Sequence, residues 1–123
     1  MKEKLFAVSL GVLALALGPA CVVSADEPGN ITVGWSFNGQ SCSQETLIES
    51  VQIVIPGEAL DNNGFYPCSV NGVDGIVLHD FAPGRYDFSI DAIDYDGTVS
   101  YSGGGSFVVD GDVFVRVDLS PNF

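Results

Sequence analysis

Three aspartates before a turn are the first residues whose types and spacing suggest chemistry. Asp91, Asp94 and Asp96 precede a glycine at short intervals, a spacing found in calcium-binding loops. The EF-hand pattern fails, because its first and twelfth ligand positions would fall on Ala92 and Gly103. The last aspartate and its glycine also form an ordinary hairpin turn. We therefore predict a turn here, keep the three aspartates as weak candidate calcium ligands, and predict no cofactor.

The single histidine suggests a second kind of site. His79 is followed by Asp80, and a hydrolase triad needs a histidine that is held by a carboxylate and faces a nucleophile. The sequence contains no Gly-x-Ser-x-Gly elbow. A chain this small predicts no deep cleft for a substrate. We therefore predict that the protein is not an enzyme.

Aromatic side chains suggest a third kind of site, for a glycan. Phe114 alternates with the apolar residues between Val113 and Leu119, so strand geometry places it on the opposite, outer face. Exposed aromatic rings beside carboxylates are how sandwich domains bind sugars. The candidates are Phe65, Tyr66, Tyr95, Tyr101 and Phe114. Most of them are expected to pack in the core or in cross-strand pairs, so glycan binding is an alternative rather than the main prediction.

The charge balance excludes some partners. The chain has 16 Asp and Glu against four Lys and Arg, a formal net charge of −12. Lys2 and Lys4 are its only lysines, so Arg85 and Arg116 are the only cations of the remainder. Such a surface does not suit nucleic acid or an anionic membrane.

Residues 1–25 are predicted to be a signal peptide. Two lysines precede the apolar run Leu5–Leu17, which is shorter than the ~20 residues of a membrane span. Small residues at 23–25 favour cleavage before Asp26 and a secreted or periplasmic protein. The alternative is lipidation of Cys21, which would make the chain an outer-membrane lipoprotein with a lipid anchor. Both outcomes stay open, and neither gives the mature protein a transmembrane span.

Cys42 and Cys68 are predicted to form a disulfide. They are the cysteines left after the predicted signal peptide, and disulfides persist in exported proteins. Closing this loop is worth about 3.5 kcal/mol in the loop-entropy model. Metal ligation is the weaker alternative, because the sequence has no Cys-x-x-Cys motif and no second histidine.

The elements that would hold these residues are short strands. After the turn Pro83-Gly84, Tyr86, Phe88 and Ile90 fall on one face, the period-2 pattern of a half-buried strand. Similar segments cover 31–37, 51–55, 65–68, 76–81, 99–109 and 113–119, with one helical turn expected around 45–48 and a bulge or bend at 103–105. We therefore predict one domain, 26–123, that is a seven-stranded antiparallel β-sandwich of transthyretin-like or immunoglobulin-like type.

The turn sequence also carries a resemblance. Phe81-Ala82-Pro83-Gly84-Arg85-Tyr86 and the closing strand Phe107–Leu119 resemble the carboxypeptidase regulatory-like domains, which are transthyretin-like (prealbumin-like) sandwiches similar in shape to Cna-B repeats. The resemblance covers about half of residues 26–123 and implies an accessory module without catalytic residues. A Lys–Asn isopeptide of the Cna-B type is excluded, because no lysine follows Lys4.

These observations predict a noncatalytic exported module of the envelope or cell surface, with a structural or adhesion role. Its expected partner is an unidentified protein or glycan at the cell surface. The alternative is a carbohydrate- or calcium-binding β-sandwich module.

Overall fold

The structure, a computed structural model, describes residues 26–123. The predicted signal peptide and Cys21 lie outside the described residues, so cleavage and lipidation both stay predictions. Within residues 26–123 no helix is long and apolar enough to cross a membrane. The elements are β1 (Gly29–Phe37), β2 (Ile48–Val54), η2 (Asp61–Gly64), β3 (Phe65–Pro67), β4 (Gly75–Phe81), β5 (Gly84–Asp94), β6 (Val99–Val109) and β7 (Val113–Pro121).

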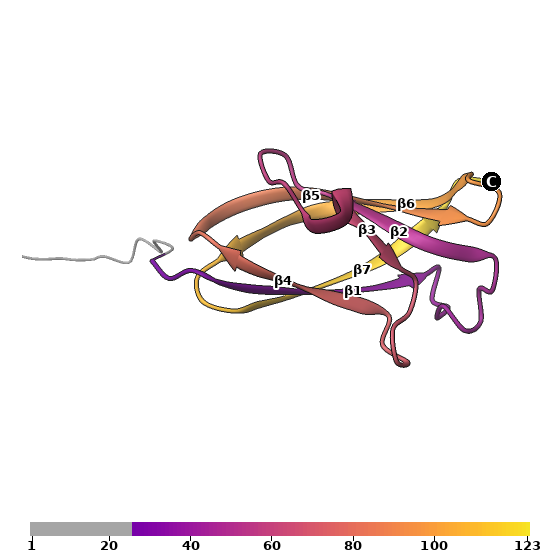
Figure 1. Ribbon diagram of the computed structural model, residues 1–123, viewed down its shortest axis with the longest axis horizontal. Coiled ribbons are helices and arrows are strands. Elements are labelled where there is room, and N and C mark those ends of the chain that lie inside the picture. The colour runs from indigo at the N-terminus through magenta and orange to yellow at the C-terminus, as the bar shows by residue number, and fades with distance from the viewer. Residues whose placement is uncertain (1–25) are drawn as a thin grey trace, which may run out of the picture.

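The seven strands form one continuous sheet, ordered β3-β2-β5-β6-β7-β1-β4, that folds over itself. Figure 1 shows two layers, with β5, β6 and β2 above β1 and β4. The layers are joined where β6 meets β7, through the pairs Tyr101–Pro121 and Ser102–Ser120. Since β3 and β4 are the free edges, the fold is barrel-like and open along one side.

The prediction of a purely antiparallel sandwich is wrong in one pairing. β1 and β7 run parallel, in register from Ile31–Val113 to Phe37–Leu119, so the sheet is mixed. Turn chemistry in a sequence predicts only pairings between strands that a short turn connects. β1 and β7 stand at opposite ends of the described chain, so their relative direction is set by packing. The all-β class and the number of strands are confirmed.

The core lies between the layers and follows the predicted alternation. Trp35 is 1% exposed, and its indole N–H donates to the backbone carbonyl of Cys68 at 2.9 Å. The disulfide between Cys42 and Cys68 is confirmed. The largest fully buried side chains are Trp35, Phe37, Ile31, Ile53, Ile90, Leu119, Val51 and Val109.

The glycine run of β6 does not make the predicted bulge. Ile90 pairs with Gly103 and Phe88 with Gly105, so the register with β5 continues through the run. A Cβ on Gly103 would lie 2.7 Å from Cδ2 of Leu119. Gly103 therefore makes room for β7 against β6, and the irregularity between β5 and β6 falls between Ala92 and Ile93 instead.

The short turns form largely where the sequence predicts them. Asn38 and Gly39 have positive φ of 52° and 85°, as a tight hairpin turn requires. Asn71 and Gly72, with φ of 52° and 80°, form the same kind of turn at the end of a small hairpin. The N–H of Ile48 donates to the carbonyl of Glu45 at 3.5 Å, which closes a turn at the predicted 45–48. Another turn precedes it, where the N–H of Glu45 donates to the carbonyl of Ser41 at 2.9 Å.

Candidate functional site

The aspartates before Gly97 organise a turn. Asp94 accepts hydrogen bonds at Oδ1 from the N–H groups of Asp96 (2.9 Å) and Thr98 (3.0 Å), and at Oδ2 from the Ser100 hydroxyl (2.9 Å). These bonds, that from Thr98 first, hold the pKa of Asp94 below its usual value. Both carboxylate oxygens of Asp94, the central candidate ligand, therefore already accept hydrogen bonds from the protein itself.

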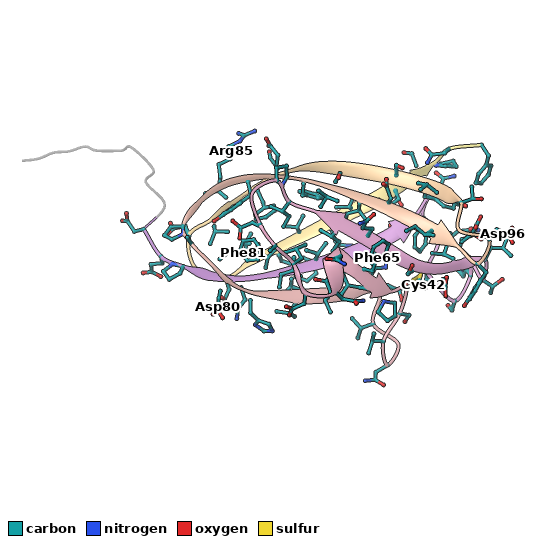
Figure 2. The ribbon with its side chains drawn as sticks, turned by 45° about the horizontal axis from the view of Figure 1, so that its top comes forward. Cys42, Phe65, Asp80, Phe81, Arg85 and Asp96 are labelled. Atoms are coloured by element: carbon teal, nitrogen blue, oxygen red, sulfur yellow. A yellow bond between two sulfur atoms is a disulfide. The ribbon has the colours of Figure 1, made fainter. Side chains whose placement is uncertain are left out.

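The other predicted chemical residues are not brought together. Asp91 accepts a hydrogen bond from the Ser102 hydroxyl at 2.8 Å, within the sheet. In residues 26–123 no three His, Cys, Asp or Glu side chains are grouped so that they could hold a metal ion. His79 is exposed on β4, and no described residue hydrogen-bonds its ring. Figure 2 shows Asp80 and Asp96 toward opposite ends of the molecule.

A groove with a volume of about 650 Å³ lies on the outer face of β4, β1 and β7. Strand register builds it from rows of residues that face outward. The first row is Val77, Thr32 and Phe114, and the second is Gly75, Gly34 and Arg116. Gly34 has no side chain, so the sheet is hollowed at this position, and the Arg116 guanidinium lies over the hollow. Part of the groove floor is therefore backbone.

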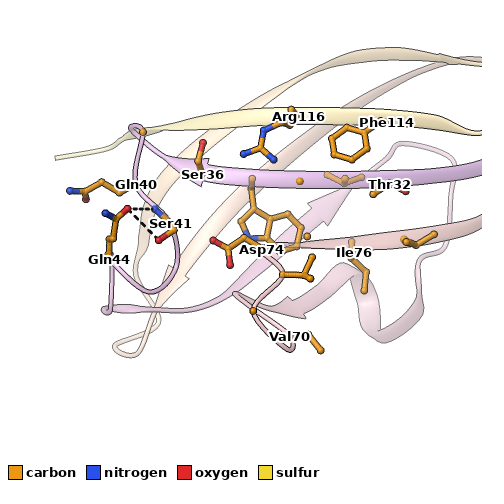
Figure 3. A pocket seen from close by; sticks show the side chains of 18 residues that line it. Thr32, Ser36, Gln40, Ser41, Gln44, Val70, Asp74, Ile76, Phe114 and Arg116 are labelled. Carbon is orange, nitrogen blue, oxygen red and sulfur yellow. Dashed lines mark hydrogen bonds between the residues drawn. The ribbon is translucent and has the colours of Figure 1, made fainter.

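Loops form the walls of this groove. Figure 3 shows Arg116 and Phe114 along the β7 side, Asp74 and Val70 on the facing side, and the 40–44 loop at one end. Val70 and Val73 belong to the small hairpin and are 44% and 61% exposed. The lining therefore combines apolar side chains with one cation and one carboxylate.

Arg116 is the cation of the groove. A Cβ on Gly34 would lie 3.0 Å from its Nη1, which places the guanidinium over β1. No hydrogen bond or ion pair joins this guanidinium to any residue in the described part of the chain. The other arginine, Arg85, lies 3.8 Å from the carboxylate of Asp87. Arg116 therefore has donors to offer to a ligand.

Asp74 is held in place from two sides. The backbone N–H of Cys42 donates to its Oδ2 at 2.8 Å, and the N–H of Trp35 donates to its backbone carbonyl at 3.1 Å. Because Cys42 is disulfide-bonded to Cys68, the covalent link also fixes this carboxylate. Its Oδ1 accepts no hydrogen bond from residues 26–123, so it remains available as an acceptor.

Asp118 fixes the end of the groove near the Asn38-Gly39 turn. Its Oδ1 accepts hydrogen bonds from the N–H of Gly39 (2.8 Å) and the Ser36 hydroxyl (2.7 Å). These bonds, the backbone one first, hold the pKa of Asp118 below its usual value. The turn that lines this end of the groove is thus tied to β7.

Phe114 is the predicted aromatic that reaches the groove, and at 63% exposure its predicted outward direction is confirmed. Tyr95 and Phe65 are 70% and 36% exposed but do not line the groove. Tyr101 is buried, and its hydroxyl donates to Glu45 at 2.8 Å; burial raises its pKa, and the bond adds to the effect.

Sequence reasoning missed most residues of this site, among them its two charged residues, Arg116 and Asp74. The signal for Arg116 was available, because it stands two residues after Phe114 and shares its face of the strand. The signal for Asp74 was hidden, since its position depends on the small hairpin and on the distant Cys42.

Comparisons of the chain with protein-family models, with curated proteins and with solved structures give no match. The carboxypeptidase regulatory-like resemblance therefore depends on the quoted turn and strand pattern alone and stays a prediction.

Proposed function

We propose that the chain is a noncatalytic exported module that binds carbohydrate in the groove over β4, β1 and β7, in an adhesion or anchoring role at the cell surface. The observation that carries the proposal is the solvent-facing ring of Phe114 beside the hydrogen-bonding groups of a preformed groove. A sugar presents an apolar C–H face and a rim of hydroxyls, and both can be matched here. Phe114 offers a ring for the first.

The polar lining suits the hydroxyl rim. The Gln44 Oε1 accepts from the Ser41 N–H at 2.9 Å, so the side-chain amide is oriented with its NH2 group left as a donor. Thr32 and Gln40 also line the groove, and their side chains make no hydrogen bond within the described chain. Asp74 adds an acceptor that is already held in place. Such preorganisation lowers the entropy cost of binding.

We propose binding without catalysis because the surroundings of His79 and Asp74 do not suit catalysis. His79 has no hydrogen-bonded carboxylate among the described residues, and Asp74 faces Arg116 across the groove rather than a second acid (Figure 3). Glycoside hydrolysis needs a pair of carboxyl groups at the bond to be cut. The groove lining contains one, so binding without cleavage is the function that fits.

The predicted export supports the same proposal. A disulfide that pins the groove wall is retained in an oxidising compartment and lost in a reducing one. A surface-exposed glycan is the ligand such a location offers. Calcium binding is not proposed, because the candidate oxygens of Asp94 are already hydrogen-bonded.

A glycan array probed with the exported protein tests this function. The expected result is binding to a restricted set of oligosaccharides, lost in Phe114→Ala and retained in Tyr95→Ala. Tyr95 is a matched control, since it is an exposed aromatic outside the groove. Silence on the array with a folded protein, or equal loss in both variants, would reject the groove as a sugar site.

A further inference from the structure

We infer that the groove selects a sugar that carries a carboxylate, of the uronic acid class, and that Arg116 is the residue that selects it. This inference rests on the proposed function and deepens it. In a chain of net charge −12, a cation in the lining of a groove is where an anionic group of a ligand can be held.

The guanidinium of Arg116 is free to take such a group. Its five N–H donors make no hydrogen bond or ion pair within residues 26–123, whereas Arg85 is near the Asp87 carboxylate. The acidic residue at the groove, Asp74, is turned to the N–H of Cys42. Arg116 therefore forms no contact ion pair with an acidic side chain of residues 26–123.

The position of Arg116 allows one ligand to contact both its guanidinium and the ring of Phe114. It follows Phe114 by two residues on the same outer face of β7, so the guanidinium and the ring lie in adjacent rows (Figure 3). A pyranose ring against Phe114 would place a C5 carboxylate near the second row. The guanidinium lies over the backbone of Gly34 and lines the groove, so a carboxylate in the groove can reach it.

A carboxylate fits this site better than a more highly charged anion. The planar fork of arginine matches the two oxygens of a carboxylate in a bidentate pair. Asp74 lines the same groove, and its negative charge opposes a second anionic group on the ligand. The acidic protein surface also repels polyanions at long range. A ligand with isolated carboxylates therefore suits the groove, and one dense in sulfates does not.

Titration calorimetry with the exported protein and matched oligosaccharides tests the inference. The probes are a galacturonate trimer, its methyl ester, a neutral galactose trimer and a sulfated galactose trimer. The expected result is that the galacturonate trimer binds at least about tenfold more tightly than its methyl ester, the range that a charge-assisted bidentate pair supplies. Raising the salt concentration should weaken that preference.

Variants of the two arginines separate selection from folding. Arg116→Gln should bind the acid and the ester with equal affinity. Arg116→Lys should restore part of the preference, because it keeps the charge but loses the fork. Arg85→Gln, an exposed arginine outside the groove, should behave as the wild type.

The outcomes distinguish this inference from the function on which it rests. Equal affinity of the wild type for acid and ester would overturn the role of Arg116 and leave sugar binding intact. Stronger binding of the sulfated trimer than of the galacturonate trimer would overturn the assignment of a carboxylate. Failure of every oligosaccharide to bind a folded protein would overturn the proposed function itself.

Discussion

Gly34 of β1 lies opposite Arg116 of β7 in the parallel register, and a Cβ on Gly34 would lie 3.0 Å from Nη1 of the arginine. The sequence did not predict the parallel pairing of β1 with β7. This pairing places the Arg116 guanidinium over Gly34, which has no side chain. It also explains why a glycine occupies the middle of a strand that is otherwise rich in large apolar residues.

The first prediction concerns this pair. Gly34→Val should move the guanidinium and fill the hollow, and so weaken the binding of an acidic oligosaccharide by about tenfold. Gly34 is not in the left-handed region, so a β-branched residue suits the strand and the protein should stay folded. Calorimetry gives the affinity, and thermal unfolding gives the control. Unchanged affinity in a folded variant would show that the hollow is not part of the site.

The glycine run of β6 gives the second prediction. Gly103→Ala would place a Cβ 2.7 Å from Cδ2 of Leu119 and should lower the free energy of unfolding by about 1–3 kcal/mol. Gly105→Ala meets the Phe88 ring at 3.5 Å, an ordinary contact, and should be neutral or slightly stabilising. Urea unfolding of both variants makes a matched comparison. Equal losses would contradict the packing of β7 against residue 103.

The disulfide gives the third prediction. Replacing Cys42 and Cys68 together by Ser should lower the free energy of unfolding by about 2–4 kcal/mol. Because Cys42 also holds Asp74, sugar affinity should fall as well. Urea unfolding with and without a reductant measures the first effect. The reductant should lower the stability of the wild type and leave the double variant unchanged; a wild type indifferent to it would refute the stabilising role.

The fourth prediction concerns acid stability. The pKa values of Asp94 and Asp118 are lower in the folded protein than the value near 3.9 of an unfolded chain. Their contribution is therefore present above about pH 4 and is lost as the pH falls through the folded-state values. Asp118→Asn should be less stable than the wild type at pH 7, and the difference should shrink below about pH 4.

Unfolding by urea across this pH range measures the effect. Asp96→Asn is the control for charge removal, because no described residue donates a hydrogen bond to the Asp96 carboxylate. A deficit in Asp118→Asn that stays constant down to pH 2 would show that the ionised form is not what holds the Gly39 turn.

The sequence predicted what local rules determine. Period-2 alternation located the strands and placed Trp35 inside and Phe114 outside, and Asn-Gly pairs located the turns with positive φ. The disulfide between Cys42 and Cys68 was predicted because these are the two cysteines that follow the predicted signal peptide. These features depend on residues that are close in the chain or on composition alone.

Pairings between distant segments could not be predicted in the same way. The parallel contact of β1 with β7 and the position of Asp74 near Cys42 depend on how the layers pack. The glycine run was misjudged for the same reason, because its neighbour is Leu119 of another strand. The groove is built from such distant pairings, so the sequence could not predict its floor or the position of the Asp74 carboxylate.

The most direct test of the proposed groove is amide chemical-shift mapping of the protein during titration with an oligosaccharide identified on the array. We expect the amides that shift to lie in β1, β4 and β7 around Gly34, Val77 and Phe114, with little change in β2 and β5. Shifts centred on β2 and β5, with the groove amides unmoved, would contradict it.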